Sequence, residues 1–137
     1  MCYTAVSRKR NPRMGERDMV GYKIDPSNKD AEFVEVNGLD DYYREIGCDC
    51  IDISVVSVHG TPFNVIVDDE GLLKGKVIAS VFNSKGYPIL ANVAIVLGFG
   101  DDCDVRSLTV DEVRALSDET YVVSHPLYGE WLALMTD

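Results

Sequence analysis

Apolar and polar residues alternate over several short segments, as they do in β-strands that bury one face. The alternation is clear in residues 32–36 (EFVEV) and in residues 50–58 (CIDISVVSV), where it shifts at Val55-Val56. A β-bulge would produce such a shift. The pattern predicts strands over residues 21–24, 32–36, 50–58, 63–67 and 92–99. Residues 77–82 fit a strand or a short buried helix, because periodicity does not separate the two at this length.

Two segments have the spacing of three and four residues that is typical of an amphipathic helix. Residues 39–46 are followed by Gly47, a residue type that often ends helices. Their apolar face consists of Leu39, Tyr42, Tyr43 and Ile46. Thr109 and Glu112 form a T-x-x-E capping box, which predicts a helix over residues 110–117.

Turn residues separate these segments. Residues 25–28 (DPSN) have turn chemistry, and His59-Gly60 stands between two predicted strands as the connection of a β-hairpin would. The elements together predict an α+β domain: a small, mostly antiparallel sheet with two short helices packed on one side.

The chain has 137 residues, the size of one domain. We expect a basic N-terminal arm over residues 1–18, an α+β domain over residues 19–120 and an apolar C-terminal extension over residues 121–137. The extension is too apolar for a solvated tail, so we expect it to pack on the body or on a partner subunit. Its apolar residues include Tyr128, Trp131, Leu132, Leu134 and Met135.

Charge is unevenly distributed. The net charge is −10, but residues 1–18 carry five basic and two acidic side chains, so subtracting their +3 leaves −13 for the remainder. An acidic body argues against nonspecific coating of nucleic acid and against docking on an anionic membrane. The sequence has no apolar run long enough to span a bilayer and no secretory signal, so we expect a cytoplasmic protein with reduced cysteines.

A set of short motifs occurs in a fixed order between residues 48 and 116. They are Ile51-Asp52-Ile53, residues 65–73 (VIVDDEGLL), residues 83–86 (NSKG), residues 94–98 (AIVLG) and Ser107-Leu108-Thr109. In this segment the chain resembles the family called domain of unknown function 3846, which occurs in phages, plasmids and bacterial genomes. The resemblance implies a phage or mobile-element context and supplies no catalytic residues.

Two acidic clusters are candidate metal sites, because clustered carboxylates bind Ca²⁺ or Mg²⁺. They are Asp68, Asp69 and Glu70, and Asp101, Asp102 and Asp104. The spacing differs from that of an EF-hand, and we expect the clusters to be solvated loops at strand ends. A metal-assisted hydrolase using these loops is one alternative function. No cofactor motif is present: Gly98-Phe99-Gly100 precedes acids, which would repel a phosphate.

No nucleophile motif accompanies the two histidines, His59 and His125. We therefore expect a non-enzymatic, oligomeric binding or regulatory protein. One alternative is a nucleic-acid mimic that occupies a DNA-binding protein. Another is a sponge for a nucleotide signal, in which aromatic residues stack on the base and basic residues contact phosphate. The candidates are Tyr42, Tyr43 and Trp131 for stacking, and Arg8, Lys9, Arg10 and Arg13 for phosphate.

Overall fold

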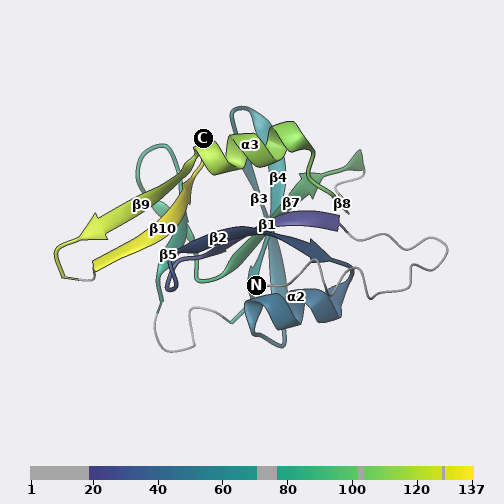
Figure 1. Cartoon of the computed structure of the whole chain (residues 1–137), viewed down its shortest axis with the longest axis horizontal. Helices are drawn as coiled ribbons and strands as arrows, with labels where there is room; N and C mark the ends of the chain where they lie inside the picture. Colours follow the sequence, from purple (N-terminus) through teal and green to yellow (C-terminus); the bar gives the residue numbers. More distant parts are fainter. Residues whose placement is uncertain (1–18, 71–76, 102–103, 128) are drawn as a thin grey trace.

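The computed structural model describes residues 19–70, 77–101, 104–127 and 129–137. These residues form two sheets and two helices (Figure 1). The larger sheet, sheet A, has the strand order β2-β1-β7-β4-β3, with β8 paired to β7. The smaller, sheet B, has the order β6-β5-β10-β9. Sheet A contains β1 (Met19–Asp25), β2 (Asp30–Val36), β3 (Ile51–Val58), β4 (Thr61–Asp68), β7 (Ala94–Phe99) and β8 (Val105–Arg106). Sheet B contains β5 (Ala79–Phe82), β6 (Pro88–Ala91), β9 (Thr120–His125) and β10 (Gly129–Met135).

Both predicted helices are present, as α2 (Leu39–Ile46) and α3 (Val110–Asp118). Gly47 ends α2 in the left-handed conformation (φ 79°), where a side chain would be strained. Thr109 and Glu112 form the predicted capping box, with hydrogen bonds of 2.9 and 3.2 Å in the two directions.

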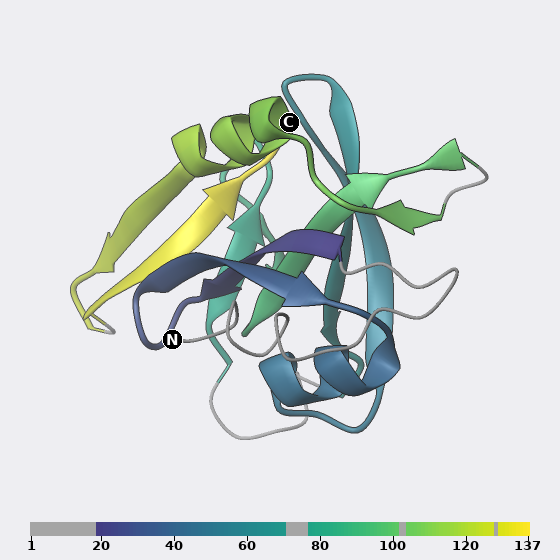
Figure 2. The ribbon, with the colours of Figure 1, turned by 45° about the vertical axis from the view of Figure 1, so that its right-hand side comes forward.

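Alternation along the central strands gives sheet A two apolar faces. On β4, Phe63, Val65 and Val67 point toward sheet B, whereas Ile66 points toward α2. Val81 of β5 and Leu134 of β10 cover the first face together with Leu116 of α3; Tyr42 of α2 covers the second. The three layers are visible in Figure 2, with sheet A between sheet B and α2.

The predicted arrangement of the helices is wrong. The two helices lie on opposite faces of sheet A, because Leu116 and Tyr42 belong to different core clusters (Figure 1). The antiparallel character is confirmed for every pairing in sheet A, although β5 and β10 pair in parallel. The α+β label is confirmed only in part, because the described residues are mostly strand.

The shift in the pattern of β3 does not correspond to a bulge. Residues pair one to one from Ile51↔Asp68 to Val58↔Thr61. The pattern shifts because β3 contributes apolar residues to both faces: Ile53 lies on the α2 side, and Val56 and Val58 lie on the side of sheet B. The hairpin turn is confirmed: His59 (φ 53°) and Gly60 (φ 78°) are both left-handed, as a two-residue hairpin of this type requires.

The described residues of the C-terminal segment, 121–127 and 129–137, are part of the fold. They contribute most of β9 and all of β10, and the side chain of Leu134 is completely buried in the main core. Residues 77–82, whose sequence pattern fits either a strand or a short buried helix, contain the strand β5. None of the helices in the described ranges is long and apolar enough to cross a membrane.

Candidate functional site

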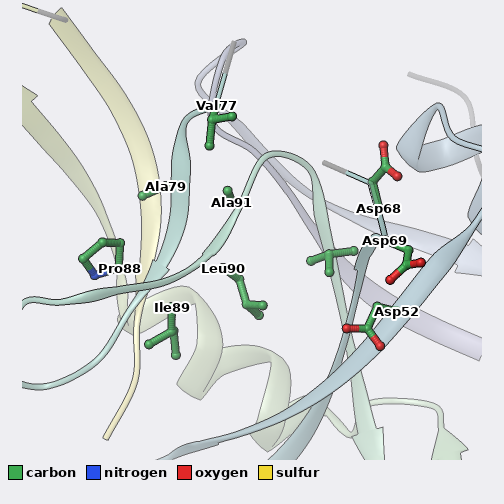
Figure 3. A pocket seen from close by; sticks show the side chains of 10 residues that line it. Asp52, Asp68, Asp69, Val77, Ala79, Pro88, Ile89, Leu90 and Ala91 are labelled. Carbon is green, nitrogen blue, oxygen red and sulfur yellow. The ribbon is translucent and has the colours of Figure 1, made fainter. Parts of the chain in front are cut away.

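A cavity of about 660 Å³ lies between sheets A and B, near the open end of the β3–β4 hairpin (Figure 3). We call it the intersheet groove. It is lined by Asp52, Val67, Asp68, Asp69, Val77, Ala79, Pro88, Ile89, Leu90 and Ala91. Ligand pockets in proteins have volumes of about 300–1,000 Å³. The groove is therefore large enough to hold a small ligand or a few side chains of a partner.

One wall of the groove is acidic. β3 and β4 pair so that Asp52 lies opposite Val67, Asp68 is the last residue of β4, and Asp69 follows it. The hairpin extends beyond the ladder through a hydrogen bond from Asp69 N to the carbonyl oxygen of Cys50, at 3.1 Å. Three carboxylates are thereby held at the open end of this hairpin, opposite the His59-Gly60 turn. Figure 3 shows them grouped on one side of the cavity.

The opposite wall is apolar and comes from β6. Pro88, Ile89, Leu90 and Ala91 follow one another along this edge strand, and the Ile89 side chain is 42% exposed. Leu90 also packs against the main core, which ties the wall to the body of the protein. Figure 3 shows this segment across the cavity from the carboxylates.

Asn92 fixes the apolar wall in place. Its backbone N–H donates to the carbonyl oxygen of Ile78 at 2.7 Å, and its side-chain oxygen accepts from the N–H of Ile78 at 3.0 Å. Its φ of 64° lets the chain turn from β6 into β7. The sequence analysis missed this role because it placed Asn92 at the start of a strand, which begins at Ala94. The available signal was the tolerance of asparagine for left-handed backbone.

The residues expected to stack on a nucleotide base do not form one site. Tyr42 is buried in the α2 face of sheet A, where burial, assisted by the charge of Asp41, raises the pKa of its hydroxyl. Tyr43 is its half-buried neighbour on α2. Trp131 is on β10 of sheet B, across sheet A from α2. The expected phosphate ligands Arg8, Lys9, Arg10 and Arg13 lie outside the described residues.

Trp131 nevertheless lies beside the intersheet groove. It lines a second cavity of about 330 Å³ that shares Val77 and Ala79 with the groove. Its indole N–H donates to the carbonyl oxygen of Ala79 at 2.8 Å. This bond orients the indole against the strand that also borders the groove.

The two acidic clusters lie at opposite ends of sheet A. β4 and β7 pair in antiparallel register, with Phe63 opposite Gly98 and Val67 opposite Ala94. Asp68 therefore lies near the beginning of β7, whereas Asp101 and Asp104 follow its end. Asp102 lies outside the described residues. In the described ranges, no three His, Cys, Asp or Glu side chains gather in a geometry that would hold a metal ion.

Comparison with known proteins identifies one family. The profile described as a domain of unknown function (DUF3846) matches residues 19–120. This match confirms the resemblance noted over residues 48–116 and extends it to β1, β2 and α2. No curated protein and no solved structure matches the chain.

Proposed function

The chain belongs to the DUF3846 family, whose description assigns no activity, and we propose that it is a binding protein rather than an enzyme. Its site is the intersheet groove, and its ligand is a basic segment of a protein partner. The observation that carries this proposal is the pairing of three carboxylates with an apolar wall in a single cavity.

Lysine and arginine side chains match both walls of such a groove. Each has an aliphatic stem that gains from apolar contact and a cationic head that pairs with carboxylates. The stem would lie on Ile89 and Leu90 of β6, and the head would reach Asp52 or Asp69. Neither of these two aspartates forms an ion pair with another described residue.

The charge of the whole protein supports the same class of partner. The net charge is −10, and −13 without residues 1–18, so the chain attracts cations at long range. Such a field raises the rate of encounter with a basic partner and disfavours phosphate-bearing ligands. An acidic groove is for the same reason a poor site for a nucleotide, whose phosphates the carboxylates would repel.

Mimicry of nucleic acid is less well supported, because a mimic needs its charges on one face. Exposed aspartates occur on both helices, which lie on opposite faces of sheet A: Asp40 on α2, and Asp111 and Asp118 on α3. The intersheet groove, in contrast, places three carboxylates beside a concave apolar surface.

The test is a titration of the protein with three probes: a short peptide that alternates leucine with arginine, the same peptide with glutamate in place of arginine, and spermidine. Isothermal calorimetry measures binding, and Trp131, the single tryptophan, supplies a fluorescence readout beside the groove. We expect the arginine peptide to bind and the glutamate peptide not to bind. Spermidine binding as tightly as the arginine peptide would identify a free polyamine as the ligand and contradict a protein partner.

Two double variants distinguish the effect of the groove carboxylates on binding from the effect of net charge. Asp52→Asn with Asp69→Asn alters the groove, whereas Asp101→Asn with Asp118→Asn removes the same charge elsewhere. We expect the groove variant to weaken binding by about tenfold or more, equivalent to about 1.4 kcal/mol, and the control to change it by about twofold at physiological salt. Equal weakening by both would show a nonspecific charge effect and refute the groove as the site.

A further inference from the structure

The outer edge of sheet B is unprotected. β9 is the last strand in the order β6-β5-β10-β9, so its backbone groups on one side have no strand partner in the described residues. Its six residues, Thr120–His125 (TYVVSH), contain no proline, lysine, arginine, aspartate or glutamate. Tyr121 and Val122 are 48% and 60% exposed. An edge strand that lacks proline and these charged residues is a template for pairing with another strand.

The other edge strands carry the features that block such pairing. β2 has Asp30, Glu32 and Glu35, and β3 has Asp52. β6 is four residues long and begins with Pro88, which has no N–H to donate. Natural sheets use charges, proline and shortness at edges to prevent association. Among the edge strands of the described part of the chain, β9 alone contains no proline, lysine, arginine, aspartate or glutamate at any position.

We propose that β9 pairs with β9 of a second copy of this chain, joining two copies of sheet B into one continuous antiparallel sheet. The second copy is favoured over other partners by charge. A body of −13 repels its own copy, so copies meet best where no charge is present, and β9 supplies such a strip. A basic partner would gain no ion pair from β9 itself.

The geometry is self-complementary. Two identical antiparallel strands are related by a two-fold axis perpendicular to the sheet, so every contact occurs twice. A register centred on Val122 places the two Val122 side chains opposite each other and Tyr121 opposite Val123 of the second copy. Cross-strand pairs of β-branched and aromatic side chains are favourable in antiparallel sheets. A single strand pair is a small interface, so we expect a dimer of about micromolar affinity or weaker.

The experiment is sedimentation equilibrium of the full chain over protein concentrations from about 5 µM to about 1 mM, because dimerisation follows mass action. Val122→Lys places two ammonium groups opposite each other at the two-fold axis. Leu127→Lys is the matched control: it makes the same change of charge at a side chain that is 82% exposed in the β9–β10 turn, beyond the strand.

As protein concentration rises, we expect the average mass of the wild type and of Leu127→Lys to shift toward twice the monomer mass of 15.2 kDa. Val122→Lys should lower the association constant by about tenfold or more, since like charges directly opposite each other are unfavourable. A wild type that stays monomeric throughout, or equal effects of the two lysines, would overturn the proposal. Far-ultraviolet circular dichroism confirms that each variant is folded. The result is independent of the groove, because β9 does not line it.

Discussion

Arg106 lies directly across from Gly98 in the β7–β8 pair, and its side chain crosses the space that a side chain at position 98 would occupy. A Cβ atom built on Gly98 would lie 2.8 Å from Cγ of Arg106 and 2.6 Å from Nη1. The guanidinium continues past Gly98 to Glu112, with Nη1–Oε1 and Nη2–Oε2 distances of 2.8 and 2.6 Å. Gly98 thus allows one arginine to connect β8 with the first turn of α3.

Replacing Gly98 by alanine should displace Arg106 and weaken its bonds to Glu112. We expect the free energy of unfolding to fall by about 1–3 kcal/mol, as overpacking usually costs, measured by urea denaturation. The double variant Gly98→Ala with Arg106→Ala is the control, because it removes the clashing side chain. The double variant should lose less than the sum of the two single variants. Strict additivity would show that the two side chains do not compete for space.

Glu112 makes stability depend on pH. The hydrogen bonds from Arg106 lower the pKa of Glu112 below its ordinary value of 4.5, and the capping bond with Thr109 adds to the effect. A carboxyl with a lowered pKa stabilises the fold fully above its unfolded value, and this contribution is lost as pH falls through the folded pKa. Glu112→Gln keeps the capping box but removes the charge.

We expect Glu112→Gln to lower the free energy of unfolding by about 1 kcal/mol at pH 7, a modest value because Arg106 is 39% exposed. The difference between wild type and variant should shrink as pH falls below 4.5. Urea denaturation at a series of pH values measures it. A difference that stays constant down to pH 2 would contradict the lowered pKa.

Local elements were predictable because their signals are short in range. The Thr109–Glu112 capping box and Gly47 define helix ends through contacts within one turn, and the structure has both. His59-Gly60 defines its hairpin for the same reason. Each of these features depends on residues that are neighbours in sequence, so the sequence pattern contains the whole of the signal.

The layers were not predictable because they depend on long-range pairing. Leu134 pairs in parallel with Val81, more than fifty positions away, and this pairing joins β10, and β9 with it, to the rest of sheet B. β6 went unrecognised because four residues beginning with Pro88 give too little alternation. The intersheet groove arises only where the β3–β4 hairpin meets β6, so Ile89 and Leu90 had no signal as site residues.

The contribution of residues 121–137 to the core is measurable. Leu134 is completely buried among the residues that join the two sheets, so Leu134→Ala should lower the free energy of unfolding by about 2–5 kcal/mol. Leu127→Ala, which alters a largely exposed leucine, should change it by about 0.5 kcal/mol or less. Small and equal effects would mean that the C-terminal segment is not part of the cooperative unit.

Asn92 links the stability of the fold to the shape of the intersheet groove, and two substitutions separate its two contributions. Asn92→Gly removes the side-chain bond to Ile78 N but suits the left-handed backbone, whereas Asn92→Ala removes the bond and also strains φ. We expect losses of about 1 kcal/mol for the first and about 2–3 kcal/mol for the second, because left-handed backbone adds about 1–2 kcal/mol for alanine. Urea denaturation measures both losses.

Calorimetry with the arginine peptide should show weaker binding for both Asn92 variants, because both free the chain between β6 and β7. Tight binding by either variant would show that Asn92 does not position the apolar wall.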